Sequence, residues 1–456
     1  MVASTPAEWL PILALRLDQR QAEVARRRSY VNGEAPLPEM NRNTREAWLN
    51  FQKKARTNYG GLAAGSLCNR IRAVSVTVGS DERSEALAAA RRIFRDNRLA
   101  IQVADAVWDS VVTGVGYLLL GSDSGGAVIT AEKPELFIAA PDPLRPWSAR
   151  ACAKFWRDVD AKADYALVWA GGQRQMFGRS AYVVDATSFV TTAQGGWLPM
   201  GEPETYVGTP PVAILDWKDP RGFIAPHSDV IDRINLGKLQ RLVITAMQAY
   251  RQRALKKKDM PANWDKNPDG SDIDLARVFE PSPGALWDLP EGIDIWESTP
   301  ADLIPLLEGE KADARDFAAV SGTPISVFIP DGANQSAEGA HNAKDQQISQ
   351  AQDAISRFQP AVDGIMARAL ETEGVDLAGA TVDVQFAKPE HVSMSEKYAA
   401  AALAKQAGES RKSIQRNILG YTPDQIAQDE TDLAEEQLAA ALAVETAPVV
   451  ASSAVA

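Results

Sequence analysis

The residues with the best spacing for acid–base chemistry are two carboxylates, Asp313 and Asp316, in the segment 303–320. This segment, LIPLLEGEKADARDFAAV, is predicted to be a helix, so the two side chains could act as a pair. Catalysis would need further carboxylates converging on a pocket, and no convincing set can be assembled from the sequence. Charged helix faces are far more often simply solvated, and that interpretation is favoured here.

Nucleotide-binding motifs are missing. The P-loop needs a Gly-Lys pair followed by Ser or Thr, but Gly237-Lys238 is followed by Leu239 in a predicted helix. The stretch GVGYLLLG at 114–121 precedes a strand instead of opening a helix, which argues against a dinucleotide site. A nucleotide-driven motor is therefore not expected in this chain.

Metal and nucleophile motifs are equally absent from the sequence. There is no G-x-S-x-G elbow, and the few histidines are widely separated and stand beside no cysteine pair. Surface or capping roles are favoured for these histidines, which are His227, His341 and His391. The sequence predicts no catalytic residue, no metal site and no cofactor, and so a protein that is not an enzyme.

Basic side chains gather on the segment 228–258, which is predicted to be a long helix capped by Ser228 or Asp229. They could form a stripe that faces phosphates, or they could form intersubunit or intramolecular salt bridges to the acidic insertion that follows. Since Lys256 to Lys258 directly precede Asp259, ion pairing is favoured. The residues considered are Lys238, Arg241, Arg251, Arg253, Lys256, Lys257 and Lys258.

The segment 259–302 is rich in Pro, Gly, Asp and Trp, and strongly acidic. It is predicted to be a compact, turn-rich insertion between two helices, with short strands at ARVFE and IDIWES. Its tryptophans could stack on bases, but in a small insertion they are better interpreted as core or interface anchors. These tryptophans are Trp264, Trp287 and Trp296.

The N-terminal half is predicted to be α+β with an antiparallel sheet. A helix spans 6–30, and 41–72 is helical with a break at Gly60-Gly61. Short apolar runs from 73 to about 217 predict strands, interrupted by one helix at roughly 81–113. Glycine pairs predict hairpin turns at 125–126, 171–172 and 195–196.

The remaining segments are mostly helical. A long helix is predicted over 336–372, with a kink at Pro360, followed by a strand in ATVDVQFAKPE and Ala-rich helices over 393–443. The last residues, APVVASSAVA, are expected to be disordered.

The stretch SGTPISVFIPDGANQSAEGA at 321–340 has two turns around an apolar run and no chemical group suited to catalysis. The residue before Pro324 avoids the helical region, which ends one helix, and Asp331-Gly332 turns the chain. Asn334 or Ser336 can cap the next helix. A mechanical task, with the apolar loop held between two bends, is the interpretation that fits best.

Composition limits the classes of protein further. A chain of 456 residues corresponds to about two to four structural units. Its net charge of −12 disfavours tight nucleic-acid binding, which requires Lys and Arg at phosphates. It does not exclude a protein that contacts DNA without binding it tightly. Cys68 and Cys152 imply no disulfide framework and fit assembly in a reducing compartment. No secretory signal or membrane span is expected.

The order of these parts resembles the portal proteins of tailed bacteriophages, specifically the SPP1-like portal family of many actinobacteriophages. The resemblance is carried by YVNGEAPLP (30–38), DVIDRINLGKLQRLVITAMQAYRQRAL (229–255) and, most specifically, SGTPISVFIPDGANQSAEGA (321–340). The order of elements covers nearly the whole chain.

This resemblance implies a portal fold and a dodecameric ring. Its parts would be a wing of helices and antiparallel sheet, a two-helix stem, a small α/β clip, a tunnel loop, a kinked spine helix and a helical crown. The implied boundaries are 1–227 for the N-terminal wing, 228–255 and 303–320 for the stem, 256–302 for the clip, 321–335 for the tunnel loop, 336–392 for the spine helix and strand, and 393–456 for the crown and tail. The short, acidic, Ala-rich C-terminus departs from a large crown.

The resemblance also implies a function and a set of partners. The ring would occupy the portal vertex of a virion capsid, be assembled in the host cytoplasm, and let double-stranded DNA pass during packaging and ejection without reading its sequence. The terminase large subunit and a head–tail adaptor would dock at the clip, and the major capsid protein and a scaffolding protein would contact the ring. No membrane is implied.

Particular residues receive roles from this resemblance. The tunnel loop would contain Pro324, Val327, Phe328, Ile329, Asp331 and Asn334, with Val327, Phe328 and Ile329 lining or bracing the narrowest part of the channel. The stem or channel charges would be Lys238, Arg241, Arg251 and Arg253, and the clip interface would contain Trp264, Trp287 and Trp296. Another homo-oligomeric capsid or scaffold protein remains the main alternative, and a carboxylate-based hydrolase the less favoured one.

Overall fold

The structure is a computed structural model of the chain. It describes residues 3–38, 46–79, 85–180, 196–249, 253–257, 266, 269–271, 293–297, 302–329, 337–390, 394–421 and 423–445. In these ranges helices and strands alternate irregularly and all paired strands are antiparallel, which confirms the predicted α+β class.

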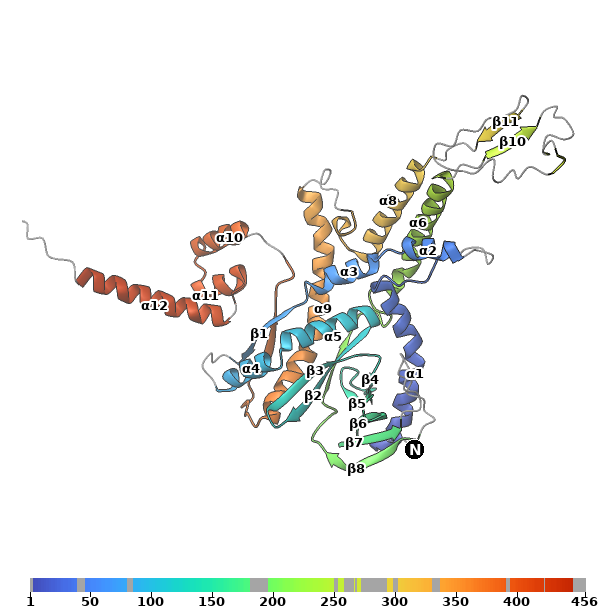
Figure 1. Cartoon of the computed structure of the whole chain (residues 1–456). Coiled ribbons are helices and arrows are strands. Elements are labelled where there is room, and N and C mark those ends of the chain that lie inside the picture. The colour runs from blue at the N-terminus through green and yellow to red at the C-terminus, as the bar shows by residue number, and fades with distance from the viewer. Residues whose placement is uncertain are drawn as a thin grey trace, which may run out of the picture.

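The described helices and strands occupy most of these ranges (Figure 1). The helices are α1 (Pro6–Val31), α2 (Glu46–Ala55), α3 (Tyr59–Cys68), α4 (Glu85–Asp96), α5 (Leu99–Thr113), α6 (Ser228–Ala249), α8 (Ile304–Ser321), α9 (Ala337–Thr372), α10 (Met394–Gln406), α11 (Arg411–Ile414) and α12 (Pro423–Glu445), with a π-helical turn η3 (Gln415–Leu419) and a 3-10 turn η2 (Ile325–Val327). The strands are β1 (Ala73–Val78), β2 (Val115–Asp123), β3 (Gly126–Glu132), β4 (Phe137–Pro141), β5 (Ala149–Asp158), β6 (Ala163–Ala170), β7 (Gln173–Ser180), β8 (Leu198–Thr205), β9 (Val212–Asp216), β10 (Arg253–Lys257), β11 (Ile293–Glu297) and β12 (Val382–Phe386).

Two sheets stack against each other in the body. The larger has the order β4-β5-β6-β7-β8 and the smaller β3-β2-β9. Helix α1 covers the outer face of the larger sheet, where Leu13 and Leu17 pack with Phe155. The other face meets the smaller sheet through a core that includes Phe137 and Trp169.

The smaller sheet follows the two-residue period of a strand buried on both faces. Tyr117 and Leu119 of β2 point to the larger sheet, whereas Leu118 and Leu120 join the main core. That core also contains residues from α5 and α9, so the body is a stack of helix, sheet, sheet and helices. A body with this much buried apolar surface provides a rigid base for the parts that project from it.

Two arginines at the C-terminal end of α1 bind to other parts of the body. Arg27 Nη1 donates to the carbonyl oxygens of Thr113 and Pro220 at 2.6 and 2.9 Å. Arg28 Nη2 lies 2.7 Å from Asp109 Oδ1 on α5, and its Nε pairs with Glu135. Burial raises the pKa of Asp109 to about 6, although the Arg28 guanidinium acts to lower it.

The helical segment 41–72 breaks at a different place from the predicted one. Helix α2 ends at Ala55 and α3 begins at Tyr59, so the predicted break at Gly60-Gly61 is wrong. The glycines instead allow close approach, since a Cβ on Gly60 would lie 2.5 Å from the Tyr30 carbonyl oxygen. The first turn of α3 thereby packs against the end of α1.

The single helix predicted over 81–113 is also wrong, because two helices occupy this segment. Between α4 and α5, Arg98 adopts a left-handed conformation with φ of 50°. The break positions Asn97, whose Nδ2 donates to Ala127 O at 2.9 Å while its Oδ1 accepts from Ile129 N at 2.8 Å. The side chain of Asn97 thus completes the outer edge of β3.

The predicted helix over 228–258 is too long at its C-terminal end. Helix α6 ends at Ala249, and Arg253 begins a strand, β10. In the β10–β11 register Arg253 stands opposite Glu297, and Lys256 opposite Asp294.

Other predictions hold or lie outside the described residues. The turns at 125–126 and 171–172 join hairpins, and the helices over 6–30 and 303–320 are confirmed as α1 and α8. Helix α9 continues through Pro360, whose predicted kink stays a prediction. The strands predicted beyond Ser180 and at ARVFE, and the tail APVVASSAVA, fall outside the described residues.

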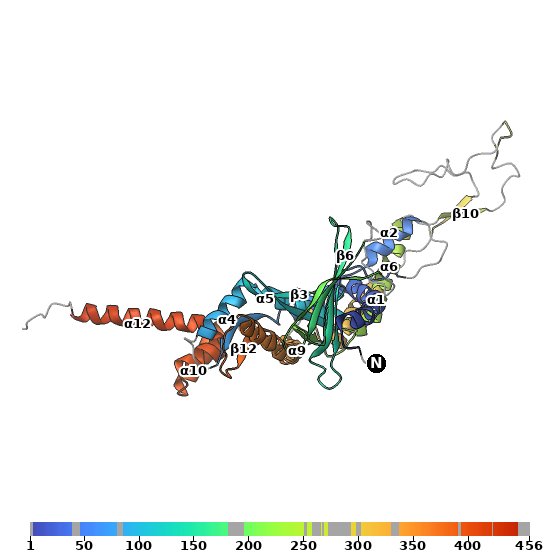
Figure 2. The ribbon, with the colours of Figure 1, turned by 90° about the horizontal axis from the view of Figure 1, so that it is seen from below.

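The molecule is elongated. Helices α6 and α8 project side by side from the body and carry the β10–β11 pair at their tip, while α10 to α12 extend in another direction (Figure 1). In the view from below, α12 and β10 lie at opposite ends of the elongated molecule (Figure 2). No described helix has the length and apolarity needed to cross a bilayer.

Candidate functional site

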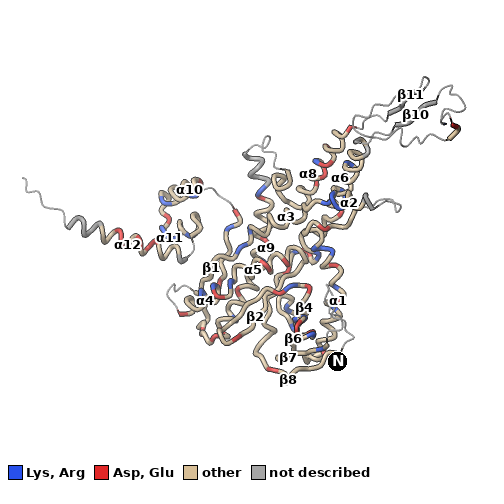
Figure 3. The backbone as a smooth tube through the Cα atoms, viewed as in Figure 1, with Lys and Arg blue, Asp and Glu red and all other residues tan. Residues whose placement is uncertain are grey.

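The candidate site is the projecting pair α6–α8 with the segment 321–329 at its base. Each helix supplies one sign of charge to the seam between them, with acidic positions on α8 beside basic positions on α6 (Figure 3). Arg233 of α6 binds Asp313 and Asp316 at 2.9 Å each, and Arg241 binds Glu310 at 2.6 Å. The antiparallel pair is thus closed by ion pairs along its length.

The geometry of Asp313 and Asp316 does not favour acid–base catalysis. Both carboxylates share one guanidinium, and neither lines the hollow described below. The described residues contain no group of three His, Cys, Asp or Glu side chains that could hold a metal ion.

Two of the four predicted channel charges are held by contacts within the chain. Arg241 is paired with Glu310, and Lys238 Nζ lies 5.2 Å from the centre of the Tyr59 ring. Burial lowers the pKa of Lys238, while the nearby Glu310 carboxylate raises it. Arg241 is thus ion-paired, but its partner lies on α8 and not in the acidic insertion, where the sequence analysis placed it.

The other two basic candidates are Arg253 and Arg251. Arg253 is in β10 opposite Glu297, and Arg251 lies outside the described residues. Among the predicted clip residues, Trp296 is in β11 opposite Ala254, whereas Trp264 and Trp287 also lie outside them. The interface role of these tryptophans therefore stays a prediction.

The segment after α8 turns into the body. Gly322 ends the helix in a left-handed conformation with φ of 65°, which explains the glycine. Pro324 is buried and precedes the 3-10 turn η2, and Asp331 and Asn334 lie outside the described residues.

Phe328 is a core residue. Only 8% of it is exposed, and its ring centre lies 5.1 Å from that of Tyr59 and 5.3 Å from that of Phe317. The expectation that Phe328 lines a channel is therefore corrected, because its ring is enclosed by its own chain. Val327 and Ile329 are partly buried against the same core, so a bracing role for the segment remains open as a proposal.

Two buried polar contacts join α6 to the body. The Asn235 Oδ1 accepts hydrogen bonds from Thr57 N and Thr57 Oγ1, both at 2.9 Å. Tyr30 OH donates to Asp232 Oδ2 at 2.8 Å, and burial together with this carboxylate raises the pKa of Tyr30 to about 12. Together with the Lys238–Tyr59 contact, these interactions fix the angle at which the helix pair leaves the body.

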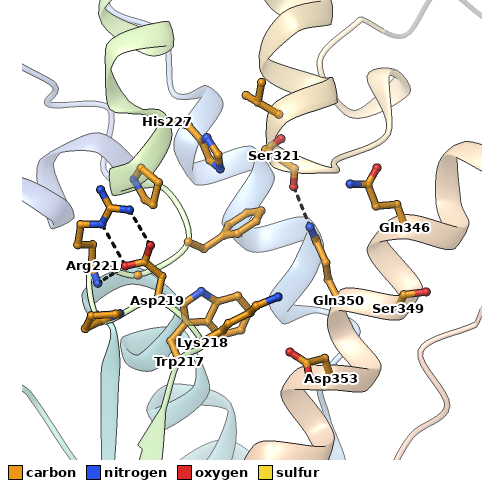
Figure 4. Close-up of a pocket in the computed structure, with 15 residues that line it drawn as sticks. Trp217, Lys218, Asp219, Arg221, His227, Ser321, Gln346, Ser349, Gln350 and Asp353 are labelled. Carbon is orange, nitrogen blue, oxygen red and sulfur yellow. Dashed lines mark hydrogen bonds and ion pairs between the residues drawn. The ribbon is translucent and has the colours of Figure 1, made fainter.

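A hollow of about 890 Å³ lies beside this base (Figure 4). One wall is the loop 217–227, with Arg221 paired to Asp219 at 2.8 Å, and the other is α9. Gln350 Nε2 reaches across it to Ser321 O at 3.2 Å, and burial lowers the pKa of His227. Buried Gln350 Oε1 has no hydrogen-bond partner among the described residues, and the polar groups of the lining form no nucleophile–base arrangement.

Sequence reasoning missed the hollow and the contacts at the base. The loop 217–227 reads only as a turn-rich connection between a strand and a helix, and Thr57, Asn235 and Tyr59 come from distant parts of the chain. Nothing in the spacing of these residues signals that they meet.

Comparisons with known proteins give only remote similarities. No protein-family model and no curated protein matches the chain. Among solved structures, a chain of the neck of a native GTA particle, computed with C12 symmetry, is 14% identical and aligns over 88% of this chain and 99% of its own, with a TM-score of 0.47. A chain of the virion of a native gene transfer agent particle has the same identity and coverage, with a TM-score of 0.43.

A third similar structure, the neck of an empty GTA particle computed with C6 symmetry, is 14% identical over 82% of this chain and 90% of its own, with a TM-score of 0.43. These values lie below those at which a shared fold can be asserted. The proposal below therefore rests on the residues of this chain.

Proposed function

We propose that this chain is a phage portal protein, which forms a ring at one capsid vertex and lets double-stranded DNA pass during packaging and ejection. The observation that carries the proposal is the projecting α6–α8 pair, closed by internal ion pairs and tipped by a separate strand pair. It supports the stem and clip that the resemblance at 229–255 and 321–340 implies.

The surface of the helix pair supports assembly with other copies. Ile304, Leu307 and Val320 on α8 and Leu236 on α6 are large apolar side chains left exposed on a single chain. Large apolar side chains exposed on a projecting element support a contact with a partner that covers them. A ring of like subunits would bury these residues at a contact repeated around the axis.

The charges of the helix pair support passage of DNA over tight binding. The cations Arg233 and Arg241 are already paired with α8 carboxylates, which leaves them less able to replace counterions on phosphates. Net negative charge on the chain works in the same direction. The channel would therefore guide the duplex electrostatically without holding it.

The proposal assigns partners by position. The tip carrying β10–β11 and the acidic insertion would dock the terminase large subunit and later the head–tail adaptor. The body would contact the major capsid protein and a scaffolding protein at the portal vertex of the virion. Wing, stem, clip, tunnel loop, spine and crown are the names that this proposal gives to the segments.

Native mass spectrometry and negative-stain images of the purified chain test this function. We expect closed rings with an axial hole; dodecamers are expected in the virion, while rings of other subunit numbers can form in solution. Monomers would contradict the proposal, and closed shells would favour the alternative of another capsid or scaffold subunit. The count in the virion requires images of the particle itself.

The docking role of the tip can be separated from assembly. Because Lys257 stands opposite Ile293 in antiparallel strands, residues 258–292 can be replaced by a two-residue Asn-Gly turn that closes a hairpin. We expect this variant to fold and form rings but to lose recruitment of terminase and adaptor in a pull-down. Retained binding would count against the docking role, and wild-type rings on the same beads serve as the control.

A further inference from the structure

The cations of the α6–α8 pair differ in what already holds them. Those of α6 are bound by carboxylates of α8 or lie over the Tyr59 ring, and they are Arg233, Lys238 and Arg241. On α8, Lys311 Nζ lies 3.4 Å from Glu308 Oε1 in an exposed pair. Arg315 of α8 is exposed and has no ion pair with any described residue. Arg315 is thus the cation of the described helix pair that is left for another ligand.

Arg315 points away from α6. Asp313 binds Arg233 of α6 at 2.9 Å, so Asp313 marks the side of α8 that faces α6. Two residues advance an α-helix by about 200°, which places Arg315 on nearly the opposite side of α8. Lys311, four residues before Arg315, lies on the same side, one turn nearer the tip.

The other flank of the helix pair is covered by α2. Asn235 of α6 accepts two hydrogen bonds from Thr57, which follows α2 directly, and Asn235 is two residues from Arg233. By the same rotation of about 200°, α2 packs on the side of α6 that is turned away from α8. The three helices therefore follow one another in the order α2, α6, α8 (Figure 1). The side of α8 that carries Arg315 is the exposed end of this row.

We propose that Arg315 of each copy contacts the phosphate backbone of the double-stranded DNA that passes through the ring. The planar guanidinium can donate two parallel hydrogen bonds to one phosphate, and such a contact does not read the base sequence. Arg315 thereby replaces Lys238 and Arg241, the cations that the sequence analysis placed at the channel. This inference rests on the proposed function, which supplies the ring and the DNA.

The position of Arg315 leaves room for the contact between copies that involves the apolar residues of α8. Ile304 and Leu307 lie toward the tip, at least about 12 Å from Arg315 along the helix, and Val320 lies about 140° round the helix from it. A single free cation from each copy also agrees with a duplex that slides, because few neutralised phosphates give an affinity that salt weakens easily.

The salt dependence of binding between purified rings and a short linear duplex tests the contact. Each neutralised phosphate contributes about 0.9 to the slope of log affinity against log salt, so raising the salt from about 50 to 200 mM costs about 3.5-fold in affinity per contact. We expect Arg315→Gln to lower this slope by at least about 0.9, equally for duplexes of different sequence. Arg315→Lys keeps the charge and should keep most of the slope.

The matched control is Lys53→Gln. Lys53 is an exposed cation of α2, at the covered end of the row of helices, so this variant removes the same charge from the other flank. Its slope should equal that of the wild type. A closed circular duplex cannot enter a ring, and its affinity should be the same for wild-type and Arg315→Gln rings.

Native mass spectrometry of the same samples shows whether the rings are intact. An unchanged slope in intact Arg315→Gln rings, or wild-type rings that do not bind the linear duplex, would overturn the inference and leave the proposed function standing. Rings that come apart on Arg315→Gln would show that Arg315 binds a carboxylate of the next copy, which also overturns the inference. A wild-type chain that forms no rings would overturn the proposed function together with the inference.

Discussion

Replacing Phe328 with Asp is expected to destabilise the folded chain strongly, and not merely to impair passage of DNA. The ring of Phe328 is packed between Tyr59 and Phe317. Truncating a buried Phe costs about 3–5 kcal/mol, and a carboxylate left there without a partner costs more. The free energy of unfolding, measured by urea denaturation, should fall by at least about 4 kcal/mol, which approaches the whole stability of many domains.

The control for this substitution lies two residues away. Ser326 is exposed in the 3-10 turn η2, so Ser326→Asp should change the free energy of unfolding by no more than about 0.5 kcal/mol. If Phe328→Asp unfolded at the same urea concentration as wild type, the aromatic contact would not exist in solution. A folded Phe328→Asp ring that fails to retain DNA would restore a channel-lining role.

Gly60→Ala is expected to destabilise the chain although it adds only one methyl group to α3. The added Cβ would stand 2.5 Å from the Tyr30 carbonyl oxygen and 3.3 Å from Ile224, so α3 would have to move away from α1. Since Tyr59 directly precedes Gly60, the shift would also disturb the contacts of the Tyr59 ring with Phe328 and Lys238. Overpacking of this kind costs about 1–3 kcal/mol, and backbone atoms cannot yield as side chains do.

Gly65→Ala is the matched control in the same helix. No atom lies within 4 Å of a Cβ at Gly65, so alanine there should leave stability unchanged or raise it by about 1 kcal/mol through its better helix propensity. Thermal unfolding of both variants would show opposite shifts. Equal shifts would indicate that the α1–α3 approach is looser than described.

The sequence predicts the type of most elements but not the breaks between them. Apolar periodicity places α1, α8 and α9 within a residue or two of their observed bounds. Apolar periodicity does not predict the break at Asn97-Arg98, because the contact made there, between Asn97 and β3, joins distant parts of the chain. In the same way, Gly60 resembles a helix breaker until the position of Tyr30 is known.

In the candidate site, too, the sequence predicts local features of the chain but not tertiary contacts. Local sequence identifies the turn residues around Pro324, whose conformations depend on their neighbours in the chain. It does not show whether Phe328 points outward or inward, since an apolar loop and an apolar core residue have the same composition. The partners of Lys238 and Arg241 are equally hidden, because Tyr59 and Glu310 reach them only through tertiary packing.

The helix pair that leaves the body at Asn235 also has a mechanical consequence. From Asn235 to its end at Ala249, α6 is about 21 Å long at a rise of about 1.5 Å per residue. This part of the helix is a lever arm, whose pivot is the set of contacts around Asn235 and Tyr59 and whose far end carries β10 and β11. A rotation of about 5° at the pivot moves the end of α6 by about 2 Å for an arm of this length. A partner bound at the far end can thus displace the contacts at the pivot, among them the Tyr59–Phe328 ring pair, without either helix having to unwind.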